Sequence, residues 1–117
     1  MIKLKVNIDY INSLYVLCVS IIQSINESLR DNKKIEDQAK FKSELYEINC
    51  VKDKLEIQRI KMRNNSWARK KIVFKLSPTQ SYLLVKYWSR NIEPINNYNM
   101  VVVSDLANDI YKQITNM

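Results

Sequence analysis

The sequence predicts a single, mostly helical α+β domain in which four helices pack against a small sheet of two or three strands. Two short segments, Ile2–Val6 and Lys71–Leu76, alternate apolar and polar residues as a strand with one buried face does. Each runs directly into a helix N-cap, and two long segments with helical periodicity separate them. The 117 residues, 1–117, have the length of one domain and bury roughly two thirds of the unfolded surface.

The first predicted helix follows the first strand without a loop. Asn7 offers an N-cap, and Asp9 places a negative charge in the first turn, where it suits the helix dipole. The helix should end near Arg30, because apolar residues recur at steps of three and four up to that point. This apolar stripe consists of Ile11, Leu14, Tyr15, Cys18, Ile21, Ile22, Ile25 and Leu29.

A polar turn, Asp31–Lys34, should connect this helix to a second helix that runs from about Ile35 to Met62. Asn32 is expected to take the left-handed conformation that glycine usually supplies. A long helix after a tight turn folds back on its predecessor, so the sequence predicts a helical hairpin between the two strands. Its apolar face should hold Phe41, Leu45, Ile48, Leu55 and Met62, and its other faces Glu44, Glu47, Lys54 and Lys61.

The second strand leads into the strongest local signal of the chain. Ile72, Phe74 and Leu76 share one face of the strand, and Ser77-Pro78-Thr79-Gln80 follows at once. This tetrapeptide is a capping box with proline at the first helical position. The helix that it starts should end near Asn91 and carry Leu84, Val85 and Trp88 inward.

A loop and a last helix are predicted for the C-terminal part. Glu93-Pro94 and the asparagine-rich residues 96–99 are typical of a loop. Ser104-Asp105 should cap the last helix, and Val101–Val103 is either a short third strand or the first turn of that helix. The apolar face of the helix should consist of Leu106, Ala107, Ile110, Ile114 and Met117.

An internal repeat is visible at an offset of 70 residues. The segment Ile2–Asn7 matches residues 72–77, and Leu14, Tyr15 and Cys18 match Leu84, Val85 and Trp88. Both copies have the order strand, cap, amphipathic helix. If the repeat is genuine, the two strands pair and their helices pack on the same side of the sheet.

The composition excludes several classes of enzyme. Because glycine is absent, the chain has neither a P-loop nor a dinucleotide-binding fingerprint. Because histidine is absent, it has no imidazole base, no Ser-His or Cys-His pair and no zinc site of the common His-containing kinds. Asp105 and Asp109 share a helix face and could share a metal, but Asp105 is explained as a first-turn acid. We therefore predict a non-enzymatic protein with no catalytic, cofactor-binding or metal-binding residues and no small-molecule substrate.

The two cysteines, Cys18 and Cys50, fall on largely apolar helix faces, so buried free thiols are expected. A disulfide between the two helices is the alternative, and it would be uncommon in a reducing cytoplasm.

The N-terminal region has some features of a secretory signal, because Lys3 and Lys5 precede the apolar run Leu14–Ile22. Polar residues interrupt this arrangement, and no small-residue cleavage site follows. The run is also shorter than the ~20 apolar residues that span a bilayer. We expect a protein without a membrane segment, located in the cytoplasm.

The net charge of +7 is concentrated in one stretch. Lys52–Lys75 holds nine Lys or Arg against Asp53 and Glu56, whereas the rest of the chain has ten bases and ten acids. Cations around an aromatic side chain suit phosphate contact combined with base stacking. The alternatives are a solvated charged face anchored by Trp67 and an acidic protein partner. The candidate contact residues are Arg59, Lys61, Arg63, Trp67, Arg69, Lys70 and Lys71.

The helix after the capping box carries more large aromatic side chains than one inward stripe can hold. Tyr and Trp are enriched at the hot spots of protein interfaces. The alternative is that its own domain covers this helix on two sides. The candidate interface residues are Tyr82, Tyr87, Trp88 and Tyr98.

These features favour a non-enzymatic structural or assembly protein that packs against copies of itself or other chains. Asn, Ile and Lys make up 42 of the 117 residues, a bias of AT-rich genomes that suits a phage virion protein or another mobile-element product in a bacterial host. One alternative is a nucleic-acid-binding accessory protein that uses the basic segment 59–75. A further alternative is a small inhibitory binder of a host protein.

Overall fold

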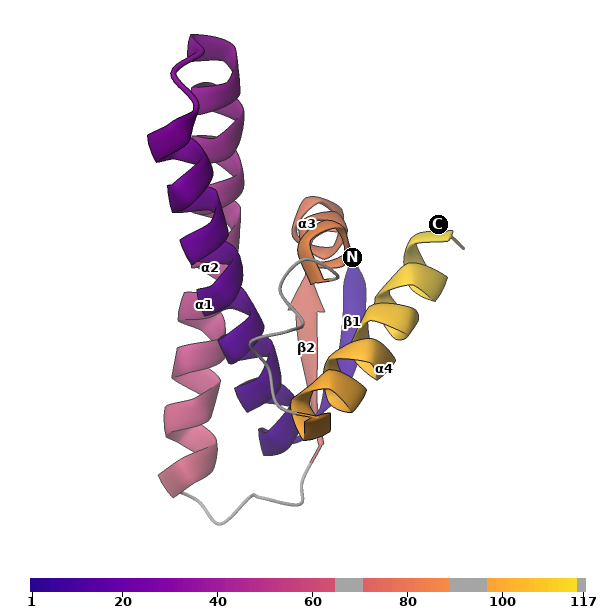
Figure 1. Ribbon diagram of the computed structural model, residues 1–117. Helices are drawn as coiled ribbons and strands as arrows, with labels where there is room; N and C mark the ends of the chain where they lie inside the picture. The colour runs from indigo at the N-terminus through magenta and orange to yellow at the C-terminus, as the bar shows by residue number, and fades with distance from the viewer. Residues whose placement is uncertain (65–70, 89–96, 116–117) are drawn as a thin grey trace.

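The computed structural model describes residues 1–64, 71–88 and 97–115, without the side chains of residues 63, 64, 97–104 and 106. The predicted class, a mostly helical α+β fold with four helices and a small sheet, is confirmed (Figure 1). The elements in chain order are β1 (Ile2–Val6), α1 (Ile8–Asp31), α2 (Ile35–Asn64), β2 (Ile72–Leu76), α3 (Pro78–Trp88) and α4 (Asn97–Thr115).

β1 and β2 pair antiparallel, and their apolar residues face the core as the alternation predicts. Ile2 pairs with Leu76, and Val6 pairs with Ile72. A shift of 70 residues converts the first of these pairs into the second, so the register matches the offset of the internal repeat. The two strands are therefore related by a local two-fold axis through the Leu4–Phe74 pair, and the helices that follow them, α1 and α3, contact each other.

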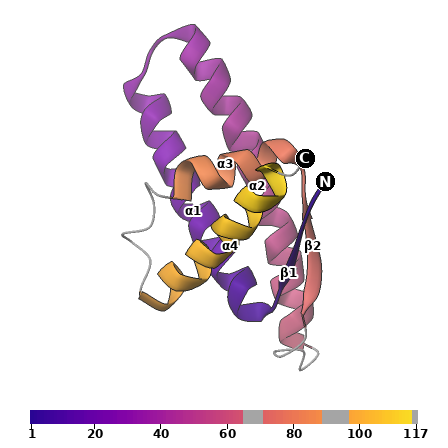
Figure 2. The same ribbon diagram turned by 90° about the vertical axis from the view of Figure 1, so that its right-hand side faces the viewer.

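α1 and α2 form the predicted antiparallel hairpin, whose far end projects beyond the sheet (Figures 1 and 2). The side chain of Asn7 caps α1 by accepting a hydrogen bond from the backbone N–H of Tyr10 at 3.0 Å. The expected left-handed conformation of Asn32 is wrong, because its backbone is extended, with φ −111° and ψ 114°. Its side chain shapes the turn instead, since its amide donates to Asp37 at 2.9 Å and its oxygen accepts from the N–H of Lys34 at 3.2 Å.

The core lies where α1 meets the inner face of the sheet, α2, α3 and α4. α1 is long and apolar enough to cross a membrane by length and composition, and 44% of its apolar window is buried inside the structure. The core helix of a soluble protein and a signal sequence near the N-terminus both meet this criterion of length and composition. The largest fully buried side chains are Ile2, Leu4, Ile11, Leu14, Leu17, Ile21, Ile25, Ile48, Leu55, Leu76, Leu84 and Ile110.

The capping box of α3 is confirmed atom by atom. The backbone N–H of Gln80 donates to Ser77 Oγ, and the N–H of Ser77 donates to Gln80 Oε1, both at 3.1 Å. α3 runs from Pro78 to Trp88, and the predicted end near Asn91 lies outside the described residues.

α4 begins at Asn97, seven residues before the predicted cap at Ser104-Asp105. The reading of Val101–Val103 as a third strand is wrong, and so is the loop expected for residues 97–99, because all of these residues are helical. The low helix propensity of valine costs less than about 1 kcal/mol per residue, which tertiary packing readily offsets. α4 packs on α3, α1 and β1, with Ala107 and Ile110 buried.

Candidate functional site

A buried carboxylate, Glu44, joins α2 to α3. Glu44 was expected on a solvated face, but it is 7% exposed, because it lies one helical turn before Ile48 on the buried side. Its carboxylate accepts hydrogen bonds from the hydroxyl of Tyr87 at 2.9 Å and from Lys86 Nζ at 3.1 Å. Lys86 neutralises the charge of the buried carboxylate, and the hydroxyl of Tyr87 gives it a further hydrogen bond. This is the arrangement of a structural ion pair.

Both cysteines are free. Burial raises the pKa of the Cys18 thiol to about 12, so at neutral pH it is a protonated core residue and not a nucleophile. Cys50 is half-buried, and its hydrogen bond with Tyr46 raises the pKa of that phenol. Among residues 1–64, 71–88 and 97–115, no three His, Cys, Asp or Glu side chains come close enough to hold a metal ion.

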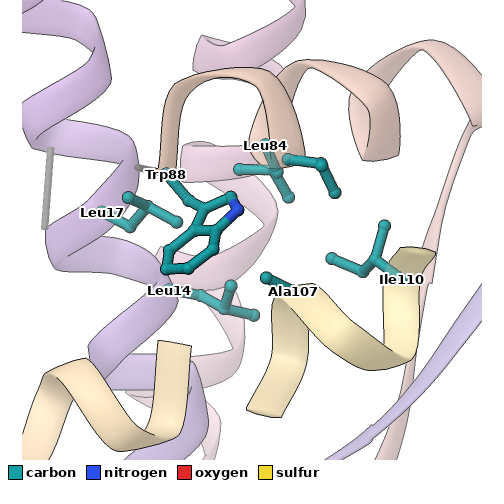
Figure 3. A pocket seen from close by; sticks show the side chains of 7 residues that line it. Leu14, Leu17, Leu84, Trp88, Ala107 and Ile110 are labelled. Atoms are coloured by element: carbon teal, nitrogen blue, oxygen red, sulfur yellow. The ribbon is translucent and has the colours of Figure 1, made fainter. Parts of the chain in front are cut away.

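A small apolar cavity lies between α1, α3 and α4 (Figure 3). Its volume of about 10 Å³ leaves room for no more than about one water molecule, so it is a packing gap and not a ligand site. The indole of Trp88 reaches into it from α3 beside Leu14 and Leu17. Trp88 therefore packs within its own chain, although part of its surface stays exposed.

The residues of the predicted aromatic interface differ in their exposure. Tyr82 is 61% exposed and can meet a partner, whereas Tyr87 is buried with its hydroxyl on Glu44. Tyr98 lies in α4, and its side chain is outside the described part of the structure. The four candidate residues thus do not form one described patch.

The residues of the predicted basic segment also differ in their surroundings. Arg59 spans the hairpin, since its Nε donates to Asn12 Oδ1 at 2.9 Å and its guanidinium lies 4.2 Å from the ring centroid of Tyr15. Lys61 and Lys71 are exposed. The side chain of Arg63 and the residues Trp67, Arg69 and Lys70 lie outside the described residues.

Lysines from distant parts of the chain meet on the outer face of the sheet. Lys3 of β1 is paired with Lys75 of β2, and Lys5 is paired with Val73, and all four side chains are exposed. Lys71 is exposed just before β2. Sequence reasoning missed Lys3 and Lys5 as members of this face, although the strand alternation and the predicted pairing together place them there.

An open groove of about 310 Å³ lies between α2 and β2 and is called here the α2–β2 groove. Ile57 and Val73 remain 53% and 52% exposed at this groove. Within the described ranges the ion pairs are Arg30–Asp31 and Lys86–Glu44, so neither lysine of the groove is in one. The lining residues are Lys54, Ile57, Gln58, Val73, Phe74 and Lys75.

Comparisons with known proteins add no family to this picture. No family model matches the chain, and no curated protein or solved structure shows significant similarity to it.

Proposed function

We propose that this chain is a non-enzymatic assembly protein that binds another protein chain at the α2–β2 groove. The observation that carries the proposal is the pair of half-exposed aliphatic side chains, Ile57 and Val73, set between Lys54 and Lys75. An apolar centre with a polar rim is the usual arrangement of a protein interface.

The groove suits a protein partner better than a nucleic acid. Binding of single-stranded nucleic acid depends on exposed aromatic faces for base stacking. The aromatic residue that lines the groove is Phe74, and it is buried with 5% exposure. The exposed apolar surface here is aliphatic, which gives contact area to a protein without offering a stacking platform.

Nucleic-acid binding remains a second candidate, because the lysines of the sheet face form one basic surface. Lys3 and Lys5 lie in β1, Lys75 lies in β2 and Lys71 comes just before β2, and all four are exposed. Such a row can neutralise phosphates without any base contact. This candidate requires binding that weakens steeply with salt.

Site-specific photo-crosslinking tests the proposed function. A photoreactive amino acid replaces Ile57 in the full chain, in cells that naturally make the protein, and the same replacement at Ile35 is the control. Both positions are exposed isoleucines of α2, but Ile35 lies at the start of the helix, away from the groove. We expect a discrete, nuclease-resistant protein adduct from position 57 and none from position 35.

The alternative outcomes decide between the candidates. Equal adducts at both positions, or none at either, would overturn binding at the groove. An adduct at position 57 that nuclease removes would reject the protein partner and favour the nucleic-acid candidate.

A further inference from the structure

The free edge of β1 is closed by a side chain of α4. The backbone N–H of Lys3 donates to Gln113 Oε1 at 3.0 Å, and Gln113 Nε2 donates to the carbonyl oxygen of Lys3 at 2.7 Å. The amide of Gln113 thus takes the place of a neighbouring strand. Figure 1 shows β1 between β2 and α4, as these bonds require.

The same bonds fix the direction of the backbone groups in β2. Because both backbone groups of Lys3 point away from β2, the Lys3–Lys75 pair is of the non-hydrogen-bonded type. The next pair of this type is Lys5–Val73. The N–H and C=O groups of Val73 and Lys75 therefore point to the outer edge of β2, and no hydrogen bond from the described residues reaches them.

This outer edge borders the α2–β2 groove, because Val73 and Lys75 both line it. At 100° per residue, α2 presents Lys54, Gln58 and Lys61 on one side, and Glu56 falls nearly opposite Lys54. Of the α2 residues that line the groove, Lys54 carries a charge, whereas Ile57 and Gln58 do not. The exposed Asp53 lies one helical turn before Ile57 and is not in the lining. The unpaired strand edge and the positive charge occur at the same place.

We infer that an extended acidic segment of a partner protein pairs with the free edge of β2 as a third strand. This inference rests on the proposed function and names the kind of partner. Strand addition uses the unpaired backbone groups for affinity, and alternate side chains select the sequence. Side chains on one face of the added strand lie beside Lys75 and Val73, where acidic residues are favoured by opposite charge. Those on the other face lie near Phe74 and Ile57, where apolar residues are favoured.

A second copy of this chain is a poor occupant of the same edge. An antiparallel pairing of two β2 strands centred on Val73 would set Lys71 of each copy against Lys75 of the other. Like charges directly opposite each other destabilise a strand pair, and lysines on edge strands are a common defence against such pairing. The charge that opposes self-pairing favours an acidic strand.

NMR titration of the ¹⁵N-labelled full chain tests the inference. The probe is a short peptide of alternating glutamate and valine, compared with a lysine–valine peptide of equal length and with oligothymidine. We expect the acidic peptide to shift the amide protons of Val73 and Lys75 and to slow their exchange with solvent. The lysine–valine peptide should cause neither change.

Charge reversal supplies the matched variants. Lys54→Glu with Lys75→Glu should weaken the binding of the acidic peptide by about tenfold or more, since two favourable charge contacts become unfavourable. Lys40→Glu with Lys42→Glu changes the same charge on exposed residues of α2 outside the groove and should leave the affinity unchanged.

The outcomes separate this inference from the proposed function. Absence of peptide binding, or binding without protection of Val73 and Lys75, overturns strand addition, whereas a protein adduct at position 57 would still support the groove. Oligothymidine binding that matches the peptide in strength and in its dependence on Lys54 and Lys75 also overturns it, because it shows a general preference for polyanions.

Discussion

Replacing Glu44 tests how far one buried ion pair holds α3 to the helical hairpin. The side chain of Glu44 is 8% exposed and that of Lys86 is 25% exposed. Glu44→Leu leaves the buried hydroxyl of Tyr87 without its carboxylate acceptor, which costs about 1–3 kcal/mol. It also removes the charge-assisted bond from Lys86, but that ammonium can turn toward solvent, so this loss is smaller. We expect a total destabilisation of about 3 kcal/mol.

A double-mutant cycle isolates the contact between Glu44 and Tyr87. Tyr87→Phe alone should cost about 1–2 kcal/mol, because it removes a hydrogen bond to a charged group. The destabilisation of the double variant Glu44→Leu with Tyr87→Phe should be smaller than the sum of the two single destabilisations by about 1–2 kcal/mol. The reason is that Tyr87→Phe removes the buried hydroxyl that Glu44→Leu would otherwise leave without its carboxylate acceptor.

Urea denaturation followed by circular dichroism measures these free energies. With m near 2 kcal/mol/M, the Glu44→Leu variant should lose about 1–2 M in its midpoint. Glu56→Leu, which removes an exposed carboxylate of the same helix, is the control and should shift stability by less than about 0.5 kcal/mol. A Glu44→Leu variant as stable as the control, or a cycle with no coupling, would refute the reasoning that this carboxylate is buried and bonded.

Three further perturbations have definite expected results. Ser77→Ala removes the side-chain acceptor of the α3 cap and should cost about 1 kcal/mol in urea denaturation. Arg59→Lys cannot keep both the hydrogen bond to Asn12 and the contact over Tyr15, so it should cost up to about 1 kcal/mol in the same assay. The folded protein keeps the Cys18 proton up to a pKa of about 12, whereas the unfolded chain loses it above 9.0. The contribution of Cys18 to stability should therefore fall between pH 9 and 12 by up to about 1.4 kcal/mol per pH unit, and the slope for Cys18→Ala should be smaller by that amount.

The elements that could be predicted are those whose signals are local. Ile2–Val6 alternates with period two, and Asn7 follows as a cap, so strand and helix start are both encoded within a few residues. The capping box at Ser77 works in the same way. The strand pairing could be predicted because the 70-residue repeat carries information between distant segments.

Each sequence-based prediction that was wrong has a physical cause. The left-handed conformation of Asn32 was predicted from its backbone tolerance. Instead, its side chain bonds to Asp37 and to the N–H of Lys34, and its backbone carbonyl accepts from Gln38, so the turn holds an extended conformation. Ser104-Asp105 has the composition of a cap and yet lies inside α4, because capping residues are tolerated within a helix that packing stabilises. Glu44 is buried because its partners come from α3, 42 and 43 residues away. No pattern within α2 reports that contact.

The candidate site was not predicted residue by residue. The basic stretch Lys52–Lys75 contains Lys54 and Lys75, but the predicted contact residues, Arg59 to Lys71, do not line the groove. The groove exists because β2 returns beside α2 after the hairpin. The sheet is also asymmetric despite its local two-fold axis, because α4 covers the edge of β1 through Gln113 and the described part of the chain provides no equivalent for β2. A two-stranded sheet is marginal by itself. An acidic third strand would pair with the free edge of β2, as the amide of Gln113 pairs with the edge of β1. The asymmetry of the sheet therefore supports a partner at the α2–β2 groove.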